Sequence, residues 1–288
     1  MSDARPPLQA PRHLVRDAVA RAIAEDLGPL GDVTAALVPA DAHAIADIVV
    51  RADGVLAGTD CATEAFAQVD PSLDVEWRAA DGATVAEKAV VATVGGALRS
   101  ILTAERTALN FLCHLSGVAT ATRRFVDVLE GRARIAETRK TLPGLRALEK
   151  AAVRAGGGVN HRGSLSDMVL VKDNHLVQMG ISEAIARARA VWPGRGVEVE
   201  CERVDQVLEA LDAGADLVML DNMTPDAAAQ CVAVVRESPR PSVLVELSGG
   251  VTLENVRAYV DAGVDIVSTS AITQSAPALD IALDLRVR

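Results

Sequence analysis

The chain has 288 residues, half of them hydrophobic, with a formal net charge of −10 and only 2% aromatic residues. This length and hydrophobic content predict a folded globular protein with a large core and exclude a disordered one. An acidic chain with few aromatic side chains lacks both the basic face that grips phosphate backbones and the platforms that stack single-stranded bases. The composition therefore argues against nucleic acid as a partner.

No apolar run reaches the roughly 18 residues that a membrane span needs, so we expect no membrane partner. The cysteines lie far apart in the sequence and form no CxxC pair; they are Cys61, Cys113, Cys201 and Cys231. Such spacing argues against a zinc site or a disulfide framework and fits a reducing compartment. We therefore expect a cytoplasmic protein.

The first 115 or so residues predict a smaller α+β domain. Apolar runs at 45–51 and 89–95 are bounded by glycines, as short strands usually are, and a long helical pattern follows from about 100 to 129. We place the domain boundary near residue 115, so that a second domain begins at 116.

From residue 133 onward, short apolar runs alternate with amphipathic stretches. Apolar strands separated by helices are typical of a parallel sheet covered by helices, and six such units predict a (β/α) barrel or a near relative. The predicted strands are 133–138, 168–172, 197–201, 216–221, 243–247 and 265–269. The predicted helices are 181–192, 203–213, 225–237 and 252–262.

An internal repeat supports this architecture, because residues 211–218 (LDAGADLV) recur as 260–267 (VDAGVDIV). In each copy we expect the glycine to end a helix and the chain to turn directly into a strand.

Polar or charged residues stand at the end of every predicted strand. They are 137–140 (ETRK), 172–175 (KDNH), 200–202 (ECE), 221–222 (DN), 246–250 (ELSGG) and 268–270 (STS). In barrel enzymes the active site lies at the carboxyl ends of the strands, because the βα loops converge there. Six such ends in succession are hard to explain as solvated turns and predict an active site.

These strand ends fall into groups of opposite charge. The early ones supply cations that suit a ligand with several negative charges, namely Arg139, Lys140, His161, Arg162 and Lys172. The later ones supply Glu200, Asp221 and Glu246, which suit a divalent metal, sugar hydroxyls or a developing positive charge. Residues 248–250 and 268–270 follow the last strands, where barrels often bind phosphate.

A ligand with anionic groups and a phosphate, reacting through a cationic transition state, would use the cations, the acids and the loops 248–250 and 268–270 together. Glycosyl transfer from an activated sugar phosphate is such a reaction. The alternatives are a solvated basic helix face for the cations and structural ion pairs for the acids.

Several blocks closely resemble the signature sequences of the quinolinate phosphoribosyltransferase family. In the second half they are 138–146 (TRKTLPGLR), 156–162 (GGGVNHR), 172–175 (KDNH), 198–200 (EVE), 220–223 (LDNM) and 246–250 (ELSGG). In the first half they are 25–26 (ED), 31–34 (GDVT), 54–58 (GVLAG) and 104–111 (AERTALNF). The resemblance covers nearly the whole chain in the expected order.

The resemblance implies an α/β fold in which an N-terminal α/β sandwich domain (1–115) precedes an incomplete parallel (β/α) barrel (116–274). The C-terminal tail, about 275–288, would return to complete the first domain. It also implies a homodimer with shared active sites, in which Arg106 enters the site of the partner. The implied reaction joins quinolinate to phosphoribosyl pyrophosphate, releases carbon dioxide and pyrophosphate, and gives nicotinate mononucleotide for NAD biosynthesis.

The family pattern further assigns roles to residues of this sequence. The expected catalytic residues are Lys140, Lys172, Glu200 and Asp221. The two carboxylates of quinolinate would be held by Arg106, Arg139, His161 and Arg162. The 5′-phosphate would be held by Ser248, Gly249, Gly250, Thr269 and Ser270. Mg²⁺ is the implied cofactor, bound with pyrophosphate on the side of Glu200 and Asp221.

Four positions depart from the family pattern. Ser270 and Gln274 stand where a glycine and a histidine are usual, Ser164 replaces a glycine, and Cys113 stands where glutamine is common. The first of these bears on the geometry of the phosphate loop. None of them changes the expected substrate class.

Three other readings stay open at this point. The first is the paralogue encoded with molybdenum transporters, which shares the scaffold; the blocks 160–162 and 172–175 favour the quinolinate enzyme. The second is a Schiff-base lyase with Lys172 as nucleophile. The third is a non-catalytic ligand-binding relative, which predicts loss of the charged groups at the strand ends, whereas here they are present.

Overall fold

The computed structural model describes residues 9–286. The chain forms two compact units: residues up to Arg123, Thr141–Gly157 and the segment from Ile272 onward make the first, and Arg124–Lys140 and Gly158–Ala271 make the second. The domain boundary predicted near residue 115 stays a prediction. Within the described residues, no helix is both long enough and apolar enough to cross a membrane.

The first unit is built on a four-stranded antiparallel sheet with the strand order β12-β1-β5-β3. These strands are β1 (His43–Val50), β3 (Asp74–Trp77), β5 (Val90–Ala97) and β12 (Ile281–Leu285), and a short ribbon pairs β2 (Gly54–Val55) with β4 (Thr84–Val85). The C-terminal strand β12 pairs along β1, from Ala46 opposite Leu285 to Val50 opposite Ile281.

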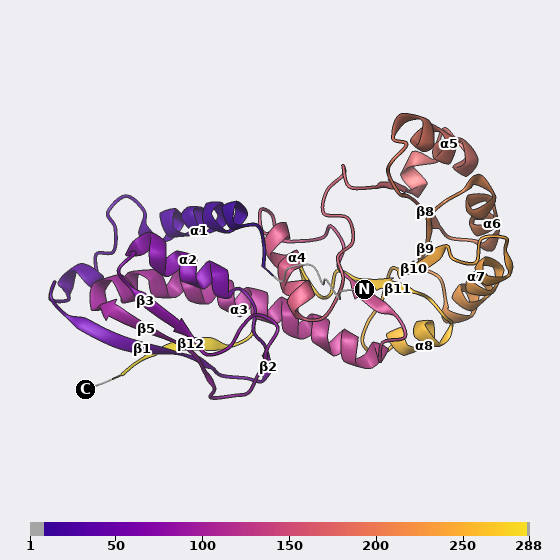
Figure 1. Ribbon diagram of the computed structural model, residues 1–288. Helices are drawn as coiled ribbons and strands as arrows, with labels where there is room; N and C mark the ends of the chain where they lie inside the picture. The colour runs from indigo at the N-terminus through magenta and orange to yellow at the C-terminus, as the bar shows by residue number, and fades with distance from the viewer. Residues whose placement is uncertain (1–8, 287–288) are drawn as a thin grey trace, which may run out of the picture. The chain divides into compact units, whose positions relative to one another are not determined.

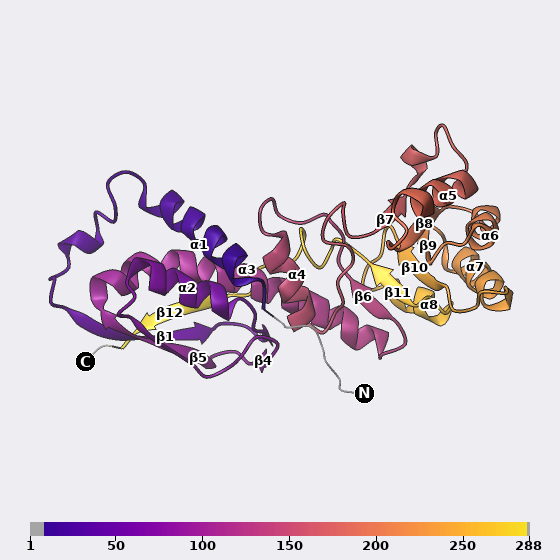
Figure 2. The ribbon, with the colours of Figure 1, turned by 45° about the horizontal axis from the view of Figure 1, so that its top comes forward.

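Helices cover one face of this sheet (Figures 1 and 2). They are α1 (Arg12–Leu27), α2 (Thr59–Val69) and the beginning of α3 (Leu98–Leu129), with the short turn η1 (Ala35–Leu37) between α1 and β1. Phe66 of α2, Ile101 and Leu112 of α3 and Ile48 of β1 are fully buried and form the apolar core of the unit. Burial of such side chains is the main source of its stability.

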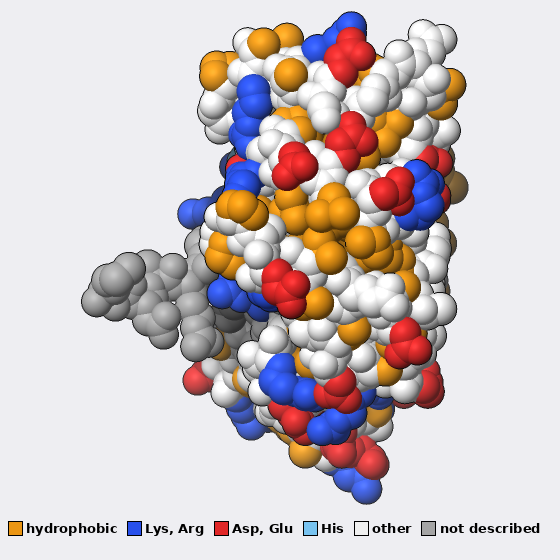
Figure 3. Space-filling model, turned by 90° about the vertical axis from the view of Figure 1, so that its right-hand side faces the viewer, with side chains coloured by type: hydrophobic (Ala, Val, Ile, Leu, Met, Phe, Trp, Pro, Cys, Tyr) orange, Lys and Arg blue, Asp and Glu red, His pale blue; other side chains and the backbone are white. Residues whose placement is uncertain are grey.

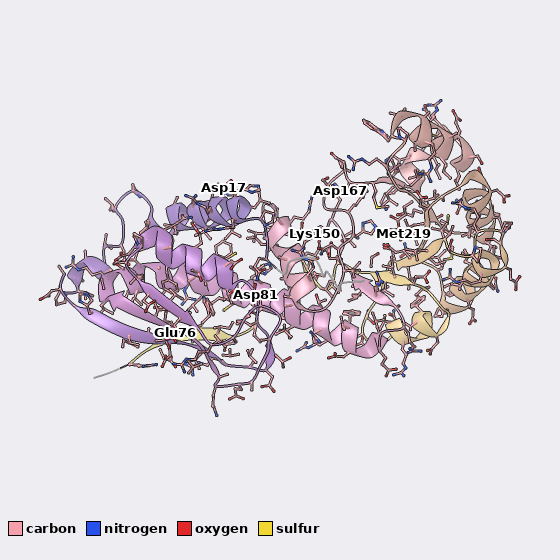
Figure 4. The ribbon with its side chains drawn as sticks, viewed as in Figure 1. Asp17, Glu76, Asp81, Lys150, Asp167 and Met219 are labelled. Atoms are coloured by element: carbon pink, nitrogen blue, oxygen red, sulfur yellow. The ribbon has the colours of Figure 1, made fainter. Side chains whose placement is uncertain are left out.

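The start of α2 shows how a distant residue fixes a helix end. Gly58 precedes the helix with a φ of 92°, and the carboxylate of Asp81 accepts the backbone N–H groups of Gly58 and Thr59 at 3.2 and 3.1 Å. These N–H groups have no partner within the helix, so the carboxylate acts as its N-terminal cap. Asp81 is labelled in Figure 4. The first unit also contains α4 (Arg146–Ala155).

The second unit is a six-stranded parallel sheet in the order β6-β11-β10-β9-β8-β7. Its strands are β6 (Arg134–Ala136), β7 (Val169–Val171), β8 (Val197–Cys201), β9 (Leu217–Asp221), β10 (Leu244–Ser248) and β11 (Ile266–Ser268). Because β6 and β7 are the two edges of this order and no described strand joins them, the barrel is incomplete. All six strands predicted from the sequence are confirmed, and so is the α/β fold class.

Four helices lie on the outside of the curved sheet (Figure 1). They are α5 (Ile181–Val191), α6 (Val204–Ala213), α7 (Pro225–Glu237) and α8 (Val256–Asp261), and the turn η2 (Asp173–His175) follows β7. The last helix was predicted over 252–262 and begins later, because the side chain of Asn255 accepts the N–H of Thr252 and holds residues 252–255 in a turn. Figure 3 looks onto the outer surface, where acidic and basic side chains surround apolar ones.

The repeated segments occupy equivalent places in the barrel. Gly214 ends α6 with a φ of 93° before β9, and Gly263 follows α8 with a φ of 92° before β11. Side chains other than glycine rarely adopt this conformation, which explains the glycine in both copies. The prediction that each repeat turns from a helix directly into a strand is confirmed.

Candidate active site

A cavity of about 610 Å³ opens at the carboxyl ends of the barrel strands, entirely within the second unit. It brings together most of the residues that the sequence predicted, namely Arg139, Lys140, His161, Arg162, Lys172, Glu200, Asp221, Ser248, Gly249 and Gly250. The other lining residues are Thr138, Leu170, Met219, Asn222, Glu246 and Ser268. Figure 4 labels Met219, which points from β9 toward the enclosed space.

The cationic side of the cavity follows β6 and the segment before β7. Arg162 is half-buried, and its burial together with the nearby Arg139 guanidinium lowers its pKa. An arginine remains charged in spite of such a shift. Two neighbouring guanidinium groups in a partly desolvated pocket repel each other, and an anionic ligand would relieve that repulsion.

A turn behind Arg162 explains one departure from the family pattern. The carboxylate of Asp167 accepts the N–H groups of Gly163 and Ser164 at 2.6 and 3.2 Å, and the hydroxyl of Ser164 at 2.7 Å. Ser164 therefore adds a hydrogen bond that a glycine could not make. Figure 4 labels Asp167 at this turn.

A buried acid pair faces His161 on the inside of the barrel. The Nε2 atom of His161 lies 3.0 Å from Oε2 of Glu198 and 3.5 Å from Oε2 of Glu246, and both carboxyl groups are fully buried. Burial and the neighbouring Glu198 raise the pKa of Glu246 to about 7, while His161 acts in the opposite direction. The geometry therefore favours a proton on Glu246, because two buried carboxylates side by side would otherwise both be charged.

The sequence prediction gave no role to Glu198. A signal was available, because β8 alternates and places Glu198 and Glu200 on the same face of the sheet. The ligand atoms of His161, Glu198 and Glu246 all lie within 4.8 Å of one another, which is also close enough to surround a metal ion.

Lys172 and Glu200 form an ion pair between the neighbouring strands β7 and β8. The turn after β7 fixes the lysine, because its backbone N–H donates to Nδ1 of His175 at 2.9 Å. The block 172–175 thus builds a rigid turn that presents one ammonium group to the cavity.

Asp221 ends β9, and Ser248 stands opposite it at the end of β10. The loop after Ser248 turns through Gly249 and Gly250, whose φ angles of 90° and 62° suit glycine. Asn222 donates a hydrogen bond from Nδ2 to Oδ2 of Asp221 at 2.7 Å. The sequence prediction placed Asn222 among the polar strand ends but assigned it no role.

Three predicted residues do not line the cavity. Thr269 is buried, and its hydroxyl accepts the N–H of Ala271 at 3.2 Å and donates to the carbonyl of Val251 at 3.4 Å; Ser270 follows it. Arg106 lies on α3 in the first unit, where its side chain is 62% exposed and stands 4.0 Å from Glu105. Cys113, another of the four departures from the family pattern, donates its thiol to the carbonyl of Ile281 at 3.5 Å.

Known proteins match the chain over nearly its full length. Residues 32–116 match the quinolinate phosphoribosyl transferase N-terminal domain, and residues 118–284 match the C-terminal domain of the same family. The carboxylating nicotinate-nucleotide pyrophosphorylase of Mycobacterium leprae is 44% identical over 275 residues, which cover 94% of this chain and 96% of that protein. A Bacillus subtilis protein described as a probable enzyme of the same name is 39% identical over 264 residues, covering 91% and 90%.

Solved structures agree with this assignment. The nicotinate-nucleotide pyrophosphorylase of Francisella tularensis superposes with a TM-score of 0.92 at 36% identity, covering 99% of this chain and all of that one. The enzyme of the same name from Ehrlichia chaffeensis gives a TM-score of 0.88 at 34% identity, with coverage of 94% and 98%. The chain belongs to the quinolinate phosphoribosyltransferase family.

Proposed function

We propose that this protein transfers the phosphoribosyl group of phosphoribosyl pyrophosphate to the ring nitrogen of quinolinate and releases carbon dioxide, giving nicotinate mononucleotide and pyrophosphate. The observation that carries the proposal is the family match over both domains, together with a cavity in which the family's charged residues meet. Relatives of similar length are named carboxylating nicotinate-nucleotide pyrophosphorylases. NAD biosynthesis is the process that this product would serve.

Quinolinate carries two carboxylates on adjacent ring carbons, and we assign them to the cationic side of the cavity. Arg139 and Arg162 supply planar guanidinium forks that fit carboxylates, and each charged hydrogen bond contributes roughly 1.5–3 kcal/mol. His161, whose Nε2 atom contacts the buried carboxyl groups of Glu198 and Glu246, adds a third donor on the same side. This clamp orients the ring nitrogen toward the sugar.

The phosphoribosyl pyrophosphate belongs on the remaining wall. Lys140 and Lys172 are the ammonium groups that would meet the pyrophosphate, and Glu200 and Asp221 would face the ribose. The loop Ser248–Gly250 would hold the 5′-phosphate, with Thr269 and Ser270 supporting it from the next loop. Backbone N–H groups in such glycine turns are common phosphate ligands.

Mg²⁺ fits the donor set of this wall. Glu200 and Asp221 offer carboxylate oxygens, the ligands that this ion prefers, and both line the cavity. Glu200 is already engaged by Lys172, so Asp221 is the better placed of the two to hold the ion with pyrophosphate. Bound there, Mg²⁺ would neutralise charge on the leaving group.

The chemistry follows from where the charges lie. The bond between the anomeric carbon and pyrophosphate breaks, and the carboxylates of Glu200 and Asp221 stabilise the positive charge that develops on the sugar. The ring nitrogen donates its electron pair to that carbon and becomes positive. The carboxylate next to it then leaves as carbon dioxide, its bonding electrons stay on the ring carbon beside the cationic nitrogen, and that carbon takes up a proton.

We also propose a cytoplasmic homodimer in which Arg106 reaches the site of the partner. The exposed position of Arg106 on α3 supports this, since 62% of its side chain is accessible. All four cysteines are free thiols, which agrees with a reducing compartment.

A paired assay tests the proposed function. Purified protein, Mg²⁺ and phosphoribosyl pyrophosphate are incubated with quinolinate or with nicotinate, and both nucleotide and carbon dioxide are measured. We expect equal amounts of nicotinate mononucleotide and carbon dioxide from quinolinate and no product from nicotinate. Folded protein that binds quinolinate but forms no product would refute the proposal and favour the paralogue or a non-catalytic role.

A further inference from the structure

Asn222 has a backbone conformation that non-glycine residues seldom adopt. Its φ is 54°, and the other described non-glycine residues with positive φ are Lys88 and Glu130, neither of which lines the cavity. The left-handed region strains most side chains, and asparagine tolerates it better than most. Residues held in this conformation tend to cluster at functional sites.

The conformation lets Asn222 connect two neighbouring strand ends. Its backbone N–H donates to the carbonyl of Ser248 at 3.1 Å, and its side-chain Nδ2 donates to Oδ2 of Asp221 at 2.7 Å. One residue therefore ties the carboxylate at the end of β9 to the first residue of the glycine loop that follows β10.

Gly249 completes this arrangement from the other strand. A Cβ atom at this position would lie 2.3 Å from Oδ1 of Asn222 and 2.9 Å from its backbone nitrogen. Both are closer than real Cβ atoms approach other atoms, so the glycine and the asparagine amide are fitted to each other. The loop and the carboxylate thus form one mutually constrained unit.

We propose that Asn222 is a positioning residue for the phosphoribosyl donor: it fixes the Asp221 carboxylate relative to the Ser248–Gly250 loop. This inference rests on the proposed function, in which the carboxylate faces the ribose and the loop holds the 5′-phosphate. A sugar phosphate bound at both places needs a set separation between them. The cations that would bind quinolinate lie on other strand ends and do not depend on Asn222.

Two variants separate this role from that of an ordinary turn residue. Glycine fits a φ of 54° better than asparagine, so Asn222→Gly should keep or raise the melting temperature while removing the Nδ2 donor. Asn222→Asp keeps the size of the side chain but replaces the donor with a negative charge next to Asp221. A residue that only makes a turn would tolerate the glycine without kinetic effect.

We expect Asn222→Gly to raise the KM for phosphoribosyl pyrophosphate about tenfold and to lower kcat, since a lost hydrogen bond also loosens the bound geometry. Asn222→Asp should be at least as impaired. The dissociation constant of quinolinate, measured by calorimetry, should change less than about twofold, because its cations are untouched. Lys88→Gly is the matched control: it relieves a φ of 68° on the first unit and should change stability alone.

The outcomes are distinguishable. A wild-type protein without product from quinolinate and phosphoribosyl pyrophosphate would refute the proposed function itself. An active wild type with an Asn222→Gly variant of equal kcat and KM would overturn the inference. It would also be overturned if Asn222→Gly melted at a lower temperature and lost affinity for both substrates equally, because that is a folding effect.

Discussion

The ammonium group of Lys172 donates a hydrogen bond to a carboxylate oxygen of Glu200, joining neighbouring strands at the mouth of the barrel. The lysine side chain is 40% exposed toward the cavity, and the glutamate side chain only 10%. The two opposite charges therefore offset each other at the wall of the cavity until a ligand binds. A pyrophosphate that meets Lys172 must also change the surroundings of Glu200, so the two residues should act as a unit.

A double-mutant cycle on this pair tests that coupling. Lys172→Met and Glu200→Gln should each lower kcat/KM for phosphoribosyl pyrophosphate by about 10² to 10³, the usual loss for one electrostatic group of an active site. The double variant should lose little more than the worse single variant, as residues that act together do. Losses that multiply in the double variant would mean that the two residues act independently.

The charge of Arg162 beside Arg139 should lower the stability of the ligand-free protein and strengthen the binding of quinolinate. Because burial and Arg139 lower the pKa of Arg162, its charge is unfavourable in the empty site. Arg162→Gln should therefore raise the melting temperature of the ligand-free protein and raise the KM for quinolinate at least tenfold. Scanning fluorimetry with and without quinolinate measures both effects, since a ligand that binds the folded state raises its stability.

The control for this experiment is Arg132→Gln. Arg132 belongs to the same unit, and it pairs with Asp261 on the surface at 2.5 Å, where such pairs contribute little. We expect neither the melting temperature nor the KM for quinolinate to change appreciably. If Arg162→Gln lowers the melting temperature instead, the guanidinium stabilises the fold, and its repulsion with Arg139 does not destabilise the ligand-free protein.

The sequence predicted the strands well because each is a short apolar run between turn signals. The range of β8, 197–201, and that of α7, 225–237, match the structure to the residue. The strands β6 and β11 are shorter than predicted, because their paired residues run only from Arg134 opposite Ile266 to Ala136 opposite Ser268. Parallel strands place these ends together, so a shared cavity could be expected from the pattern alone.

The remaining features depend on contacts that no local pattern contains. Glu198 and Glu246 belong to strands separated by β9, and only the curvature of the sheet brings their carboxyl groups to one histidine. The left-handed conformation of Asn222 follows from its fit with Gly249, a residue 27 positions later. Propensity gives asparagine a tolerance for that conformation but no requirement for it.

The buried acid pair predicts how stability depends on pH. Burial and Glu198 raise the pKa of Glu246 from 4.5 to about 7, so the folded protein keeps a proton that the unfolded chain releases. The contribution of this bound proton to the stability of the folded protein is complete below pH 4.5, and it is lost as the pH rises through about 7. For one proton, the slope of the unfolding free energy can reach about 1.4 kcal/mol per pH unit.

Urea unfolding of the wild type and of Glu246→Gln between pH 5 and 8 measures this slope. The amide cannot ionise, so the variant should lose stability less steeply and should gain on the wild type as the pH rises. Equal slopes in the two proteins would show that Glu246 does not hold the proton.

The repeated segments carry a pair of aspartates that close the amino end of the barrel. Asp216 accepts the N–H of Val197 at 2.7 Å and a guanidinium hydrogen of Arg189 at 2.8 Å. Asp265 does the same for the N–H of Val245 at 2.8 Å and for Arg236 at 2.7 Å. In both cases one carboxylate accepts hydrogen bonds from a backbone N–H near the beginning of a neighbouring strand and from an arginine near the end of a helix.

Removing either carboxylate should therefore affect folding and not chemistry. Asp216→Ala and Asp265→Ala should each lower the unfolding free energy by about 1–3 kcal/mol, the cost of leaving such donors without a partner. The cavity lies at the opposite ends of the strands, so kcat should stay within about twofold of the wild type at a temperature where the variants are folded. Asp261→Ala, which removes one exposed partner of Arg132, is the control and should cost less than about 1 kcal/mol. An Asp265→Ala variant as stable as this control would mean that the repeat is maintained by its glycine alone.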